Sequence, residues 1–194
     1  MNIRVIKGTE LSQEEVDSLV RDLLAIRDKA LPERMRKEYA DGETFYRDQI
    51  LDPETIMICA FNSEGHATAY LAAVPHSSIY AELKEHDFQL EDDPNDEKYY
   101  VENIASLERS LLAARVVIEL VRELARETDR RGRKQVAMHI RIENDLANLV
   151  TSFFPMEVTR LIPFWYYTEE PAYYMVAHID KQVWYHKEKK RKAA

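Results

Sequence analysis

The stretch most suited to chemistry runs from Ser106 to Ala114, where a predicted strand turns directly into a long predicted helix. The first amides of a helix have no partner within it and carry partial positive charge. Such a turn favours anions such as a pyrophosphate. Ligands of open α/β sheets also tend to lie at the carboxyl ends of strands, beside a helix amino terminus. We therefore expect a binding site at this turn, although it contains no glycine.

This turn is part of a strand–helix–strand unit that extends from Lys98 to Arg141. KYYVENIAS is the first predicted strand, residues 110–127 form a helix with one apolar face, and QVAMHIR alternates as a second strand. A crossover of this kind makes its two strands parallel and is right-handed. Glu102 and His139 should therefore lie on neighbouring strands of one sheet.

Antiparallel elements are predicted on both sides of this unit. Ser12 and Glu15 form a capping box at the start of one helix. A second helix should have Pro32 in its first turn and end before Pro53. TIMICAF and HATAYLAAV form a hairpin around a polar loop that ends in glycine. IENDLANLVTSFF is a short helix, and EVTRLI and AYYMVAHI are the last two strands.

Composition is that of an ordinary globular protein, with 45% hydrophobic and 32% charged residues. We expect one α/β domain over residues 1–180 and a basic tail over 181–194, with a solvated acidic loop between Glu82 and Glu97. The single cysteine, Cys59, excludes an internal disulfide. The net charge of −8 argues against nucleic-acid binding. With no apolar run near the roughly 18 residues of a membrane span, we expect a cytoplasmic protein.

The order of the predicted elements resembles that of the GNAT superfamily, the acyl-coenzyme A-dependent N-acyltransferases. The resemblance covers nearly the whole chain as topology, and its most specific stretches are ENIASLERSLLAARVVIELVREL and KQVAMHIRIENDLANLV. It implies a GNAT-like mixed sheet, mostly antiparallel, with helices on both faces. It further implies acetyl-CoA or another acyl-CoA as donor, no metal and an amine acceptor. Members of the superfamily often form homodimers, but no interface is marked in this sequence.

In this superfamily a Q/R-x-x-G-x-G/A pattern holds the coenzyme A pyrophosphate. The corresponding residues here are Arg109, Ser110, Leu111, Leu112, Ala113 and Ala114. The arginine and the final alanine agree with the pattern, whereas Leu112 replaces the first glycine. A glycine lets phosphate approach the backbone closely. A leucine that points outward should block the anion site, and one that packs into the core should leave it open.

The resemblance also assigns roles near the next helix and strand. Asn144 leads an N-x-x-A-x-x-L-Y type helix, and Thr151 occupies the position of a tyrosine that normally protonates the departing thiolate. A threonine hydroxyl is a much poorer acid than a phenol. A backbone amide among Ile104, Ala105 and Ser106 should polarise the thioester oxygen.

Acylation of an amine requires a base, and many members of the superfamily use a glutamate on the strand before the pyrophosphate loop. Glu102 has that place here. If its side chain points inward, desolvation should raise its pKa enough for it to act near neutral pH; if it faces solvent, it is an ordinary strand glutamate. His139 is the second candidate, although a lone histidine in a strand is more often structural.

Three functions remain open from the sequence. The first is an N-acyltransferase that uses acyl-CoA and a small-molecule or peptide amine, with a cationic acceptor such as a polyamine or a lysine-bearing peptide favoured by the acidic surface. The second, suggested by Leu112 and Thr151, is a non-catalytic binding or regulatory module. The third takes its acyl group from an acyl-carrier protein. The sequence has no P-loop, no G-x-S-x-G, no H-E-x-x-H and no metal-ligand spacing.

Overall fold

The protein is described from a computed structural model, which places residues 2–31, 33, 41–108, 110–142, 146–165 and 170–179. Arg109, Asn144 and the basic tail 181–194 therefore lie outside the described residues, as does Pro32. The described elements are, in chain order, β1 (Asn2–Ile6), the 3-10 helix η1 (Gly8–Glu10), α1 (Gln13–Ala30), α3 (Gly42–Leu51), β2 (Ile56–Phe61), β3 (Ala67–Pro75), α4 (His76–His86), β4 (Lys98–Ser106), α5 (Ser110–Arg130), β5 (Gln135–Arg141), α6 (Leu146–Phe153), β6 (Met156–Trp165) and β7 (Glu170–His178).

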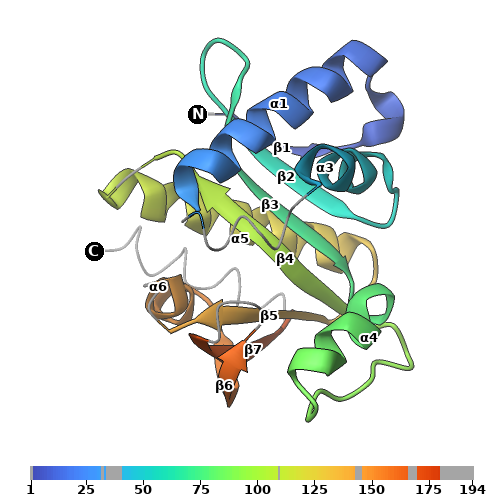
Figure 1. Cartoon of the computed structure of the whole chain (residues 1–194), viewed down its shortest axis with the longest axis vertical. Coiled ribbons are helices and arrows are strands. Elements are labelled where there is room, and N and C mark those ends of the chain that lie inside the picture. The colour runs from blue at the N-terminus through green and yellow to red at the C-terminus, as the bar shows by residue number, and fades with distance from the viewer. Residues whose placement is uncertain are drawn as a thin grey trace.

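One seven-stranded sheet organises these elements, in the order β1-β2-β3-β4-β5-β7-β6 (Figure 1). The pair β4–β5 is parallel, and the other neighbouring strands are antiparallel. The predicted mixed, mostly antiparallel sheet with one parallel crossover is confirmed. The crossover is made by α5, as the strand–helix–strand reading required.

Helices cover both faces of this sheet (Figure 1), which confirms a second prediction. Buried residues of α5 and α6 pack on one face, where they form the largest apolar cluster of the described chain. On the other face α1 and α3 cover the β2–β3 region, and α4 covers the β5–β7 region. Successive residues of β4 alternate between these layers, because side chains of a strand point to opposite faces. Tyr99 and Val101 join the α5 cluster, whereas Tyr100 joins the α4 cluster.

The start of α1 confirms the capping box. The Ser12 hydroxyl accepts a hydrogen bond from the Glu15 amide at 3.3 Å, and the Glu15 carboxylate accepts one from the Ser12 amide at 2.8 Å. The apolar positions Val16, Leu19 and Leu23 are buried against the sheet, as their spacing predicts. This helix is thereby fixed over the sheet, and its last residue, Ala30, lies beside the cavity described below.

The segment expected to be a solvated acidic loop is more ordered than its charge suggests. Its first residues belong to α4, and Asp87 and Asp93 are buried. The Asp93 carboxylate accepts a hydrogen bond from the Lys98 amide at 2.7 Å, and Asp87 pairs with Arg160. The prediction was wrong here because a few buried acids, each with hydrogen-bond donors, were hidden among exposed ones.

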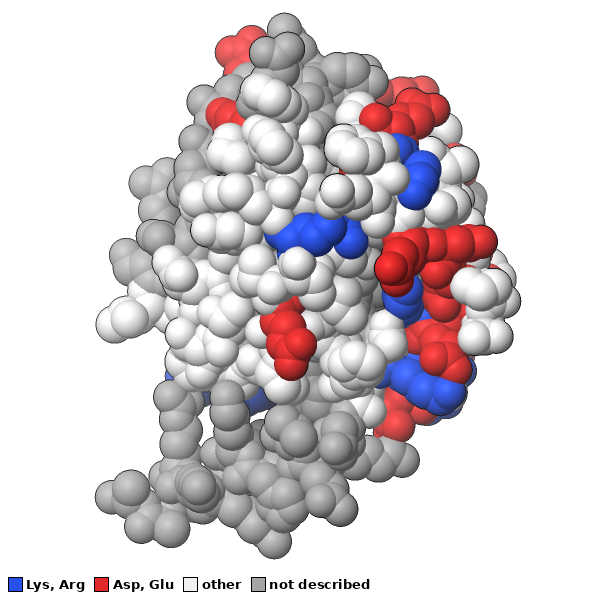
Figure 2. Space-filling view, turned by 90° about the horizontal axis from the view of Figure 1, so that it is seen from below, with Lys and Arg blue, Asp and Glu red and all other residues white. Residues whose placement is uncertain are grey.

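Figure 2 shows one face of the protein, with a broad uncharged area and most charged side chains along one side. On the described part of this face, basic and acidic groups are interspersed and form no continuous basic stripe. Among the described helices, none has the length and apolar character of a membrane span.

Candidate active site

The central feature of the candidate site is an opening between the parallel strands β4 and β5. Their pairing is limited to Lys98–Tyr100 on β4 and Gln135–Ala137 on β5. β4 continues to Ser106 and β5 to Arg141, and no further pairs join them. Backbone N–H and C=O groups on the facing edges are therefore available to a ligand, because each needs a hydrogen-bond partner.

A cavity of about 180 Å³ lies against the open end of β4. It is bounded by the end of α1, by β4 and by the helices α5 and α6; its lining residues are Ala30, Leu31, Ile104, Ala105, Ser106, Val117 and Leu146. Six of these seven side chains are apolar, and the volume is below the roughly 300 Å³ of a typical drug-sized pocket. The cavity thus suits a slim, mainly aliphatic chain. It contains the three residues that were predicted to polarise a thioester.

Glu102 lies two residues before this cavity, at an irregularity in β4. Asn103 pairs with Ala72 and Val101 pairs with Ala73, so that Glu102 is an extra residue between two consecutive positions of β3. Such bulges redirect a side chain and are frequent beside active sites. The Glu102 side chain points to the α3 face of the sheet, where Gln49 Nε2 donates a hydrogen bond to Glu102 Oε2 at 2.5 Å.

The surroundings of Glu102 favour its protonated form. Burial raises the pKa of Glu102 to about 7, and the negative charge of Glu82 on α4 acts in the same direction. The hydrogen bond from Gln49 partly opposes this rise in pKa, since it stabilises the carboxylate. Of the two orientations that the sequence left open, the structure has the inward one. A carboxyl with this pKa can both accept and release a proton near neutral pH.

His139 has a different environment. Its side chain is only 1% exposed, and both ring nitrogens have partners: Nδ1 lies 3.0 Å from the Tyr100 hydroxyl and Nε2 lies 3.3 Å from Asp87 Oδ2. The ring stacks on Trp165 at 3.8 Å between centroids. Burial lowers its pKa to about 4, so the imidazole is neutral. These contacts fix α4 to β5 and β6, and they leave no ring nitrogen to receive a proton from a substrate.

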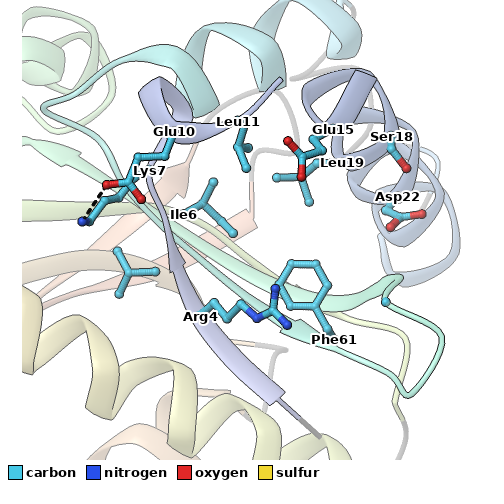
Figure 3. A pocket seen from close by; sticks show the side chains of 12 residues that line it. Arg4, Ile6, Lys7, Glu10, Leu11, Glu15, Ser18, Leu19, Asp22 and Phe61 are labelled. Atoms are coloured by element: carbon cyan, nitrogen blue, oxygen red, sulfur yellow. Dashed lines mark hydrogen bonds and ion pairs between the residues drawn. The ribbon is translucent and has the colours of Figure 1, made fainter. Parts of the chain in front are cut away.

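A larger hollow, of about 340 Å³, lies elsewhere between β1 and α1 (Figure 3). None of the residues that the sequence suggested for catalysis or coenzyme binding lines it. The charged side chains around it have other roles: Lys7 pairs with Glu10 at 2.9 Å, Glu15 completes the capping box, and Asp22 accepts the Ala67 amide at 2.8 Å. The larger volume of this hollow therefore does not make it the better candidate, and we place the candidate active site at the β4–β5 opening.

Several solved acetyltransferase structures have the same arrangement of helices and strands as this chain. The aminoglycoside 6'-N-acetyltransferase from Enterococcus faecium superposes with a TM-score of 0.64 over 93% of this chain and 98% of its own, at 14% sequence identity. The ribosomal-protein-S18-alanine N-acetyltransferase from Escherichia coli gives a TM-score of 0.59 over 92% and 95%, at 15% identity. An aminoglycoside 6'-N-acetyltransferase complexed with coenzyme A gives 0.57 over 93% and 98%, at 15% identity.

The chain has the GNAT fold. The predicted resemblance is thereby confirmed for the fold. No protein-family model matches the sequence, and no curated protein matches it either. At identities of 9 to 16%, this likeness shows the fold alone.

The first turn of α5 is the place where the sequence resemblance predicted a pyrophosphate site. Leu111 is 88% exposed and Leu112 is 48% exposed, so neither packs into the core. An outward leucine at this position fills space that a glycine would leave open to a phosphate. Ala113 and Ala114 are half-buried, and Ser110 begins the helix. The amides of Leu107 and Glu108 are already used, by Thr68 O at 2.8 Å and Ser106 Oγ at 3.1 Å.

Helix α6 contains Thr151, the residue at the position of the predicted general acid. The Thr151 hydroxyl donates to Ala147 O at 2.9 Å, which is the usual back-bond of a threonine within a helix. This contact, with the weak acidity of the hydroxyl, makes Thr151 unsuited to protonate a thiolate.

Gln49 is the site residue that the sequence did not indicate. It is separated from Glu102 by 53 positions and lies on α3. The one available signal was its burial, at 6% exposure, and burial of a polar side chain cannot be read from a local pattern.

Proposed function

We propose that this protein is an N-acyltransferase that moves an acyl group from a coenzyme A thioester to a primary amine. The observation that supports this most directly is the placement of Glu102: a half-buried carboxyl, with a pKa raised to about 7, at a bulge beside the opened β4–β5 ladder. It precedes the aliphatic cavity by two residues, about 7 Å along the strand. Base and thioester site are thus positioned by one strand.

The chemistry follows from this arrangement. Glu102 takes a proton from the acceptor ammonium, and the freed nitrogen lone pair attacks the thioester carbonyl carbon. The oxygen of that carbonyl becomes negative and is stabilised by backbone N–H groups of the open β4 edge. The C–S bond then breaks, and the sulfur leaves with the second proton that the nitrogen loses. The products are an N-acyl amide, the thiol of coenzyme A and one proton, which Glu102 releases to water.

Charge supports a cationic acceptor. The negative charge of Glu82 on α4 acts on Glu102, and the chain as a whole carries a net charge of −8. Two of the structural neighbours are, by their names, acetyltransferases of aminoglycosides and of a protein's alanine. A suitable panel therefore contains an aminoglycoside, an alanine-initiated peptide, a lysine-bearing peptide and a polyamine.

The test is release of free thiol from acetyl-CoA in the presence of each amine, with the acylated product verified by mass. Glu102→Gln keeps the shape but removes the base, and it should lower kcat by about 10²- to 10⁴-fold. Glu157→Gln, at an exposed position of β6, is the matched control and should leave kcat unchanged. Equal rates for wild type and Glu102→Gln would refute the role of Glu102.

A second candidate donor is favoured by the exposed leucines of α5. Leu111 and Leu112 place apolar surface, with the exposed Arg115 one turn on, where the superfamily holds pyrophosphate. A donor carried by an acyl-carrier protein has pantetheine but no nucleotide at this point. Comparing acetyl-CoA, acetyl-pantetheine and an acetylated carrier protein discriminates these cases. If no donor transfers its acyl group, the non-catalytic module remains.

A further inference from the structure

The carbonyl oxygen of Gln49 is an unexplained feature of the site. Gln49 is buried, and its Oε1 has no hydrogen-bond partner. A buried acceptor without a donor is costly, and in native proteins it usually indicates a missing ligand or water. When Glu102 is ionised, as it must be to act as a base, its carboxylate only accepts hydrogen bonds, so the Gln49 nitrogen faces it and Oε1 points away from it.

We infer that Gln49 is the second half of the acceptor site, with Nε2 holding the Glu102 carboxylate and Oε1 accepting an N–H of the incoming ammonium. This inference rests on the proposed function and adds a residue and a specificity to it. The amide oxygen and nitrogen share one carbon, so Oε1 lies close to the carboxylate that Nε2 contacts at 2.5 Å. Glu102 and Gln49 together thus present two acceptors to one nitrogen.

A primary ammonium meets this arrangement better than other amines do. It has three N–H donors: one for Glu102, one for Gln49 Oε1 and one for solvent or backbone. A secondary ammonium has two N–H groups, so it satisfies both acceptors only when its second alkyl group points in the third direction, which a primary ammonium fills with an N–H. Sites that hydrogen-bond a substrate group reject analogues that lack it, because their own buried polar atoms are left without partners. Gln49 should therefore contribute discrimination between a primary amine and its N-methyl analogue.

The same contact also influences the ionisation of Glu102, whose pKa is raised mainly by burial. The groups that act on this carboxyl are Gln49 and the neighbouring Tyr46 from α3, and Glu82 from α4. Of these, the Gln49 amide stabilises the charged form, and Glu82 disfavours it. Replacing Gln49 with leucine keeps the volume roughly constant and removes the donor, so the pKa of Glu102 should move further above 7.

The experiment uses the full chain and two variants, Gln49→Leu and Gln49→Asn. Carboxyl ¹³C NMR gives the Glu102 pKa without any substrate, and kinetics with a primary amine and its N-methyl analogue give the specificity. Gln49→Leu should raise the Glu102 pKa and lower kcat/KM for the primary amine by about 10- to 100-fold. Gln49→Leu should also bring the kcat/KM values of the primary amine and its N-methyl analogue closer together. Gln49→Asn, which keeps an amide, should show smaller changes in the Glu102 pKa and in these kcat/KM values.

Two results separate the possible failures. If wild type acylates amines but Gln49→Leu changes neither the Glu102 pKa nor the ratio between the amines, the inference is overturned and the proposed function stands. If no donor is used with any amine, the proposed function fails together with the acceptor role of Gln49, whatever the NMR titration gives. A merely structural Gln49 would lower thermal stability without altering the pKa or the ratio.

Discussion

Glu102→Gln should make the protein more stable at the pH where it makes it inactive. The pKa of Glu102 rises from its ordinary 4.5 to about 7 on folding. Between these pH values the carboxyl is ionised in the unfolded chain but mostly protonated in the folded protein. Since the folded pKa is the higher one, the wild type bears no penalty well below pH 4.5. The penalty grows as the pH rises towards 7 and stays constant above it. From 4.5 to about 7 it amounts to about 3 kcal/mol.

The assay is urea denaturation of wild type and Glu102→Gln at several pH values. At pH 8 the variant should gain about 3 kcal/mol, equivalent to roughly 6–12 °C in Tm for a chain of this size. At pH 5 the gain should fall to about 1 kcal/mol, because the wild-type carboxyl is then protonated in the folded state. Loss of stability by the same amount at both pH values would show that Glu102 is not a desolvated carboxyl, and would remove the basis for its role as base.

Three further predictions concern other parts of the molecule. Leu112→Gly should tighten binding of acetyl-CoA about tenfold relative to acetyl-pantetheine by calorimetry, at a helix cost of about 1 kcal/mol; unchanged affinities would show that Leu112 does not obstruct the phosphate site. Between pH 6.5 and 4 wild type should lose about 3 kcal/mol relative to His139→Gln, because the unfolded chain binds a proton that the folded imidazole, with its pKa lowered to about 4, refuses; a pH-independent difference would contradict this. Leu124→Ala, at a fully buried position of α5, should cost about 2–5 kcal/mol in urea, whereas Leu111→Ala, at 88% exposure, should cost less than about 0.5 kcal/mol.

The sequence predicted the elements that carry their own periodic signal. Ser12 and Glu15 marked the start of α1, and the alternation of QVAMHIR matched β5 from Gln135 to Arg141. Helix α4 was missed because its one deeply buried apolar residue, Leu83, stands among polar and charged neighbours that suggested a loop. A periodic pattern of apolar residues reveals a helix whose buried face extends along its whole length. Helix α4 lacks such a pattern because few of its residues are buried.

Long-range placement was less accessible. The inward orientation of Glu102 depends on a bulge against β3, and the partner Gln49 comes from a helix 53 positions earlier. Neither can be derived from local spacing, because both arise from the register of distant strands. In the same way, nothing in the order of the last two strands indicated that β7, and not β6, would lie beside β5.

The short parallel ladder between β4 and β5 has a consequence for hydrogen exchange. Along a strand, the N–H groups of successive residues point alternately to the two neighbouring strands. Beyond Tyr100, those that face β3 are paired, and those that face β5 have no strand partner. In the free protein the exchange rates along Asn103–Ser106, the regular part of the strand after the bulge at Glu102, should therefore alternate between slow and fast with a period of two. A bound thioester would slow exchange only at the amides that face β5. The difference in exchange rate between neighbouring amides of β4 therefore shows whether the opening is occupied.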